Sequence, residues 1–149
     1  MREAPDFTLL GQDDHEHSLS DYHGHWVVLY VYPKDDTPGC TAEACAFRDE
    51  HEAIAATTNA TVIGVSTDSV ESHKRFANKY HLSFTLLSDP DHALIQALGS
   101  WDNDRSATLR NTYIINANGE IVRSYEKVDP ASHVPQILKD LPELMTSTS

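Results

Sequence analysis

Two cysteines, Cys40 and Cys45, are the residues of this chain whose type and spacing most directly indicate chemistry. A cysteine reacts as the thiolate, and a free thiol is only slightly ionised at neutral pH, so a reactive cysteine needs a site that stabilises the anion. Cys40 follows Thr37, Pro38 and Gly39, a run that predicts the start of a helix with Thr37 as its N-cap. We therefore expect the unpaired N–H groups of that first turn to face the sulfur of Cys40.

The residues just before the first cysteine impose a further requirement. Asp35 and Asp36 stand close by in the sequence and would disfavour a thiolate if they pointed toward it. The hydroxyl of Thr37 lies within reach of the same point and can donate to the anion. A cation is also required, and Lys34, Arg48 or an arginine distant in the sequence must supply it.

The five-residue spacing constrains how the two cysteines can react with each other. Five residues of helix advance about 7.5 Å and place the two side chains on different faces, with Cα atoms more than about 8 Å apart. A disulfide requires Cα atoms within about 7 Å of each other. The cysteines can therefore bond only if the helix unwinds locally, which would couple a redox step to local unfolding. For Cys45 alone, the alternative is an inert cysteine packed in an Ala-rich helix.

Other cysteine and histidine chemistries fit the sequence less well. A zinc site needs four ligands, usually with a shorter cysteine spacing, and only two cysteines are present. The pairs His15/His17 and His23/His25 lie in a polar, turn-like segment, and we interpret them as solvated surface histidines. The Cys-x-x-Cys spacing of a simple dithiol oxidoreductase is absent.

Length and composition exclude several classes of function. The 149 residues fit one domain, predicted to span residues 1–149. With 11 basic and 23 acidic side chains the formal net charge is −12, which argues against nucleic-acid binding. No apolar run approaches about 20 residues, so no membrane-spanning helix is predicted. The first residues lack the apolar stretch of a secretory signal, and we expect a cytoplasmic protein.

Hydrophobic patterning predicts the elements that must position the cysteines. Continuous runs of β-branched and other apolar residues predict two buried central strands, at Trp26–Tyr32 and Thr61–Thr67, and a short strand is predicted at Phe84–Leu87. Asn118-Gly119 lies between two alternating runs, which predicts a hairpin pairing about Thr112–Ile115 with Ile121–Tyr125.

Four helices are predicted between and after these strands. The first runs over about Pro38–Ala56. The second starts from a cap at Asp68, with Glu71 completing a capping box. The third runs from Asp89-Pro90 to Gly99, and the fourth ends at about Leu141. Strands separated by helices predict a largely parallel sheet covered on both faces, and the hairpin adds antiparallel strands. The sequence thus predicts a thioredoxin-like α/β fold with a mixed central sheet flanked by helices.

The segment Tyr32–Cys45 resembles the active-site signature of peroxiredoxins, and is most similar to the Q-type group that includes the bacterioferritin comigratory protein. The signature Pro-x-x-x-Thr-x-x-Cys is present as Pro33, Thr37 and Cys40, with a second cysteine five residues later. The resemblance continues toward the hairpin through Phe47–Asp49, Gly64–Asp68 and Phe84–Asp89. Trp101–Arg110 departs from the family pattern because it is short and lacks glycines.

The resemblance implies a role for each matching residue. It makes Cys40 the peroxidatic cysteine and Cys45 the resolving cysteine. Thr37 is then the hydroxyl that orients thiolate and peroxide, and Pro33 the residue that shields the pocket from water. Arg110 is the cation that supports the thiolate, and Glu43 the polar residue that orients this arginine.

The resemblance further implies thiol-dependent reduction of hydrogen peroxide and organic hydroperoxides. Cys40 would become a sulfenic acid, form an intramolecular disulfide with Cys45, and be recycled by thioredoxin or a similar dithiol reductant. No metal or other cofactor is expected, since sulfur carries both electrons, and a monomer is expected. The alternatives are a thiol-disulfide oxidoreductase, a glutathione-type peroxidase on the same fold, and a non-catalytic binding or chaperone-like module.

Overall fold

A mixed six-stranded sheet with strand order β1-β10-β9-β4-β5-β6 forms the centre of the protein. The computed structural model describes residues 2–58, 60–130 and 132–148. The strands of the sheet are β1 (Arg2–Glu3), β4 (Trp26–Val31), β5 (Ala60–Ser66), β6 (Thr85–Ser88), β9 (Asn111–Ile115) and β10 (Glu120–Tyr125). β4, β5 and β6 pair in parallel, whereas β9 is antiparallel to β4 and to β10. The predicted mixed sheet is therefore confirmed.

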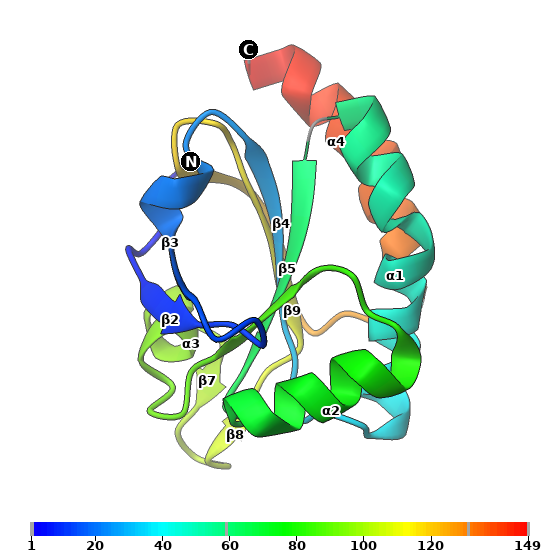
Figure 1. Ribbon diagram of the computed structural model, residues 1–149. Coiled ribbons are helices and arrows are strands. Elements are labelled where there is room, and N and C mark those ends of the chain that lie inside the picture. The colour runs from blue at the N-terminus through cyan, green and yellow to red at the C-terminus, as the bar shows by residue number, and fades with distance from the viewer. Residues whose placement is uncertain (1, 59, 131, 149) are drawn as a thin grey trace.

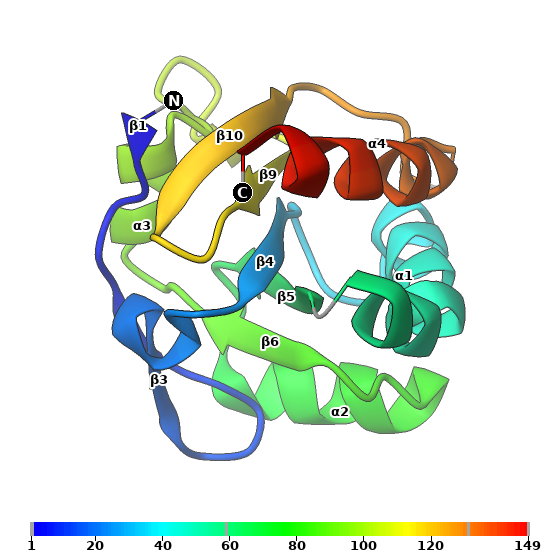
Figure 2. The same ribbon diagram turned by 90° about the horizontal axis from the view of Figure 1, so that it is seen from above.

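Helices cover both faces of this sheet (Figures 1 and 2). They are α1 (Pro38–Thr58), α2 (Val70–Tyr80), α3 (Ala93–Leu98) and α4 (His133–Thr148), with a short 3-10 helix η1 at Leu19–Tyr22. Side chains of α1, α2 and α4 share one apolar cluster, and side chains of α3 and η1 belong to a second cluster on the opposite face. Within the described part of the chain, no helix is long and apolar enough to cross a membrane.

The central strand β4 supplies side chains to both clusters. Val28 and Tyr30 belong to the cluster under α1, whereas Val27 and Leu29 belong to the cluster under α3. This alternation follows from the strand pleat, and burial of both faces explains why the sequence of β4 is continuously apolar. Cys40 belongs to the first cluster, so the candidate thiol lies on the α1 face of the sheet.

The predicted hairpin of β9 and β10 is confirmed, and its first strand, β9, also pairs with β4. Tyr125 pairs with Thr112 and Ile121 with Ile115, and the register shifts by a bulge between Ile121 and Arg123. Gly119 has a φ of 84°, a left-handed conformation that glycine adopts without strain. The residue before β9 is Arg110, so the pairing of β9 with β4 brings Arg110 near the start of α1.

The structure corrects the predicted starts of two helices. α2 is capped by Ser69, whose hydroxyl accepts from the Ser72 N–H, because the Asp68 carboxylate instead accepts from the Ser66 hydroxyl and the Asp35 N–H. α3 begins at Ala93 rather than at Asp89-Pro90. The Asp89 carboxylate nevertheless accepts from the N–H of Ile95, in the first turn of α3.

The last helix is longer than predicted. α4 extends to Thr148 instead of ending near Leu141, because Leu144 and Met145 still pack against the apolar cluster under α1. It begins at His133, so Pro135 lies in the first turn, where its missing N–H removes no helical hydrogen bond.

Two small hairpins were not predicted. β2 (Thr8–Leu10) pairs with β3 (Glu16–Ser18), and β7 (Trp101–Asp102) pairs with β8 (Ala107–Thr108). Their strands are two or three residues long, too short for an alternating pattern to be recognised.

Candidate active site

Cys40 is the third residue of α1 and is 1% exposed. The first helical hydrogen bond runs from the Thr41 N–H to the Thr37 carbonyl, at 2.8 Å. The N–H groups of Gly39 and Cys40 precede this bond and therefore have no acceptor within the helix. Together with the positive end of the helix dipole, they favour an anion at the start of α1.

Arg110 supplies a cation to this position. Its Nη2 donates to the sulfur of Cys40 at 3.2 Å, and its Nη1 donates to Oε1 of Glu43 at 2.7 Å. The backbone is held by the N–H of Val128, which donates to the Arg110 carbonyl. Although burial disfavours the charge, the facing Glu43 and Cys40 raise the pKa of Arg110 above its usual value. The guanidinium is therefore a fixed positive charge beside the thiol.

Gly39 makes room for this guanidinium. A Cβ atom at this position would lie 3.1 Å from Nη2 of Arg110 and 3.3 Å from Cγ of Pro130. The first distance is shorter than ordinary van der Waals contact, so any larger residue would press on the group that contacts Cys40. The glycine before the cysteine is thus part of the site.

Glu43 lies one turn after Cys40 on α1 and is completely buried. Burial raises its pKa to about 8, even though Arg110 acts in the opposite direction. Its second carboxyl oxygen, Oε2, lies 3.2 Å from Nε2 of His133, at the start of α4. The polar site therefore continues from Cys40 through Arg110 and Glu43 to His133. No motif in the sequence marks His133 as part of it.

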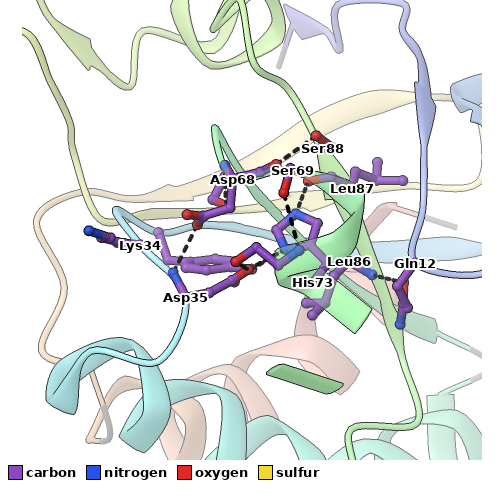
Figure 3. A network of polar contacts seen from close by, with 12 residues as sticks. Gln12, Lys34, Asp35, Asp68, Ser69, His73, Leu86, Leu87 and Ser88 are labelled. Atoms are coloured by element: carbon purple, nitrogen blue, oxygen red, sulfur yellow. Dashed lines mark hydrogen bonds and ion pairs between the residues drawn. The ribbon is translucent and has the colours of Figure 1, made fainter. Parts of the chain in front are cut away.

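Asp35 and Asp36 both turn away from the thiol toward α2. Asp36 accepts from Lys79 and from the Tyr80 hydroxyl, each at 2.8 Å. The side chain of Asp35 is buried beside His73 (Figure 3). The local repulsion expected from these two carboxylates is removed by this orientation.

The buried environment of Asp35 is a closed polar network. His73 is fully buried, with Nδ1 2.7 Å from Oδ2 of Asp35 and Nε2 2.8 Å from the carbonyl of Leu87. The hydroxyls of Tyr32 and Ser72 also donate to Asp35. Both ring nitrogens of His73 therefore face oxygen atoms of other elements. The network holds the segment before α1 against α2 and β6.

The remaining residues named from the sequence lie around this centre. The hydroxyl of Thr37 donates to the carbonyl of Lys34 at 2.9 Å instead of to the thiol. Pro33 and Lys34 are exposed. Arg48 donates to the carboxylate of Asp49 and to the Tyr80 carbonyl. Of the candidate cations, Arg110 is therefore the one that the structure brings to the sulfur of Cys40.

Cys45 lies on the same helix as Cys40 and is half-buried, and both cysteines are free thiols. α1 is continuous from Pro38 to Thr58 and so includes both positions. Over five residues of intact helix the two Cα atoms are too far apart for a disulfide.

A comparison with protein families matches residues 1–124 to the AhpC/TSA family. The chain belongs to this family. It is 41% identical over 149 residues to peroxiredoxin Bcp of Bacillus subtilis, covering 96% of this chain and 94% of that protein. It is 45% identical over 143 residues to the chloroplastic peroxiredoxin Q of Sedum lineare, covering 94% of this chain and 76% of that protein. The predicted resemblance to Q-type peroxiredoxins is confirmed.

Solved structures of AhpC/TSA relatives have the same fold. A cysteine-to-serine mutant of Xanthomonas campestris peroxiredoxin Q aligns with a TM-score of 0.87 at 33% identity, covering 92% of this chain and 90% of that one. Peroxidoxin BcpB of Mycobacterium tuberculosis aligns with a TM-score of 0.86 at 29% identity, covering 99% and 96%. The thioredoxin-like fold is therefore confirmed, and this AhpC/TSA protein is an enzyme that reduces peroxides in a thiol-dependent reaction. The family implies a peroxide substrate and a thioredoxin-type reductant.

Proposed function

We propose that Cys40 is the thiolate that attacks the peroxide and that Arg110 is the cation that stabilises it. The observation that carries this proposal is the 3.2 Å contact between Nη2 of Arg110 and the Cys40 sulfur, at the N-terminus of α1. The thiol is buried among apolar side chains, where a fixed positive charge acts more strongly than in water.

In the first step the Cys40 thiolate attacks the terminal oxygen of the peroxide. A sulfur–oxygen bond forms as the oxygen–oxygen bond breaks, the sulfur loses two electrons, and an alkoxide or hydroxide leaves and takes a proton from water. Arg110 and the N–H groups of Gly39 and Cys40 stabilise the charge that develops on the leaving oxygen. The hydroxyl of Thr37, which donates to the Lys34 carbonyl in the free enzyme, orients the peroxide, and Pro33 limits access of water to the thiolate. The product on the enzyme is a Cys40 sulfenic acid.

In the second step the Cys45 thiolate attacks the sulfur of the Cys40 sulfenic acid. A disulfide forms, and the oxygen leaves as hydroxide, which takes a proton to become water. The start of α1 must unwind for the two sulfurs to meet, since the helix is intact from Pro38 onward. The contacts of Asp35 and Asp36 with α2 favour a segment that unwinds from residue 37 onward rather than before it. A thioredoxin-like dithiol then reduces the disulfide by exchange.

The proposal is tested with reduced protein, thioredoxin and either hydrogen peroxide or an organic hydroperoxide. Both peroxides should be consumed by the wild-type protein, and oxidised protein should contain a Cys40–Cys45 disulfide within one chain. The Cys45→Ser variant is the matched control, because it should still react once with peroxide but form no intramolecular disulfide. Oxidised protein with only intermolecular disulfides would contradict the role of Cys45.

We also propose that the protein acts as a monomer in the cytoplasm. The formal net charge of −12 on 149 residues opposes non-specific self-association. Sedimentation of the reduced and the oxidised protein should give the mass of one chain, and a dimer mass in either state would refute the monomer.

A further inference from the structure

His133 holds its imidazole ring in a single tautomer. Its Nδ1 lies 2.7 Å from the backbone carbonyl of Asp129. A carbonyl oxygen can only accept a hydrogen bond, so Nδ1 carries the proton. If the ring is neutral, its other nitrogen, Nε2, is therefore an acceptor.

Nε2 of His133 nevertheless faces a carboxyl oxygen. Oε2 of Glu43 lies 3.2 Å away, and the hydroxyl of Thr112 lies at the same distance from Nε2. Among the described residues, Oε2 of Glu43 has no hydrogen-bond partner, although Glu43 is completely buried. An ionised Glu43 beside a neutral His133 would place two acceptors against each other without solvent. A proton on one of the two facing atoms, Oε2 or Nε2, removes this repulsion and gives the buried carboxyl oxygen a partner.

We propose that Glu43 is a neutral carboxylic acid at neutral pH, that its Oε2 donates this proton to Nε2 of His133, and that His133 is thereby a positioning residue of the peroxidase site. The inference rests on the proposed role of Cys40 and deepens it. It assigns the shared proton to Glu43 and leaves the guanidinium of Arg110 without a neutralising carboxylate.

The surroundings of the pair favour the proton on Glu43. Burial raises the pKa of Glu43 to about 8, and burial lowers the pKa of His133 below its usual value. Tyr30 from β4, Arg110 before β9 and Asp129 before α4 are the titratable groups that act on the pair, and Cys40 from α1 acts on Arg110 and Tyr30. Arg110 favours ionisation of Glu43 and disfavours an imidazolium at His133, so it does not itself put the proton on Glu43.

This assignment balances the charges of the site. With a Cys40 thiolate, a cationic Arg110 and a neutral Glu43–His133 pair, the four groups have no net charge. If the pair loses its proton, Glu43 becomes a second anion on the same guanidinium. Arg110 is then shared between two negative groups and stabilises the thiolate and the leaving oxygen less. The reaction with peroxide should therefore slow as the pH rises past about 8.

The pH profile of the single-turnover reaction with hydrogen peroxide tests this consequence. If only the protonated pair supports the full rate, one pH unit above the midpoint should leave about a tenth of that rate. In Glu43→Gln the amide oxygen can still accept from Arg110 and the amide nitrogen can donate to His133 at every pH, so the alkaline decline should disappear. Glu52→Gln, an exposed position on the same helix, is the matched control and should retain the decline. An alkaline decline that persists in Glu43→Gln would overturn the proposal.

Nitrogen NMR of the histidines tests the position of the proton without any assay of activity. At neutral pH, His133 of the unmodified protein should give the signals of a neutral ring with a proton on Nδ1 and none on Nε2. An imidazolium signal, or a proton on Nε2, would overturn the assignment. His133→Leu removes the acceptor and should move the midpoint of the alkaline decline, and an unchanged midpoint would show that His133 does not accept the proton of Glu43. Because NMR reports on the histidine directly, its result is separable from a failure of the proposed role of Cys40.

Discussion

The guanidinium of Arg110 donates to the sulfur of Cys40 although the two residues are 70 positions apart in the sequence. Two neighbouring strands bring them together. α1 follows β4, and Arg110 immediately precedes β9, which pairs with β4 so that Asn111 lies opposite Val31. The site therefore lies at the end of the sheet where the last residue of β4 and the first residue of β9 are paired.

Replacing Arg110 by an uncharged residue should reduce activity far more than stability. Arg110→Met should lower kcat/KM for hydrogen peroxide by a factor of about 10² to 10³, the usual effect of removing one donor from a developing charge. Arg105→Met is the control, because the Arg105 side chain is 83% exposed and should tolerate the change. Equal losses in the two variants would show that the contact with Cys40 is not what matters.

Gly39→Ala should lower the activity of the site without lowering the stability of the protein. Alanine favours helices over glycine by up to about 1 kcal/mol, so the free energy of unfolding should stay constant or rise. The added Cβ would nevertheless lie 3.1 Å from Nη2 of Arg110, so the guanidinium must shift away from Cys40. We expect a slower reaction with peroxide in a protein of undiminished thermal stability. A wild-type rate would mean that the position of Arg110 can relax without consequence.

His73→Ala should destabilise the protein by about 3–5 kcal/mol, since it leaves the carboxylate of Asp35 buried without its partner. Urea unfolding monitored by circular dichroism measures this loss. The control is His15→Ala, at an exposed position, which should change the free energy of unfolding by less than about 0.5 kcal/mol. A similarly small change in His73→Ala would show that the buried network does not anchor the segment before α1.

The stability of the protein should depend on pH through Glu43. Folding raises the pKa of Glu43 from its usual 4.5 to about 8, so the folded state retains a proton that the unfolded chain releases. The stabilisation is complete below about pH 4.5, declines as the pH rises, and is lost above about pH 8. Relative to Glu43→Gln, wild-type stability should therefore fall by a few kcal/mol over this range. Parallel pH curves for the two proteins would contradict a buried, neutral Glu43.

Much of the fold was predictable because its signals are local. β4 is a continuous apolar run, and the hairpin is marked by Asn118-Gly119. The strands β2 and β3 are only three residues long and give no comparable signal. Asp68 is the expected cap of α2 from the sequence because the hydrogen bond from the Asp35 N–H to its carboxylate appears only in the fold.

The candidate site was only partly predictable from its residues. Cys40 is recognisable from its place at a helix start, whereas the choice of Arg110 and Glu43 came from the resemblance to peroxiredoxins. His73 and His133 were missed, although each falls in register with an apolar helical stripe, His73 with Phe76 and His133 with Ile137. A histidine at such a position is a signal for a buried ring, but its partners come from other elements and appear only in the fold.

The role of Cys40 is tested most sharply by the mass of Cys45→Ser after one equivalent of hydrogen peroxide. We predict that one oxygen atom is added and that peptide mapping places it on Cys40, as the trapped sulfenic acid. The same treatment of a Cys40→Ser variant should add no oxygen to the protein and leave the peroxide unconsumed. Oxidation at a residue other than Cys40, or undiminished peroxide consumption by Cys40→Ser, would show that Cys40 is not the peroxide-reducing thiol.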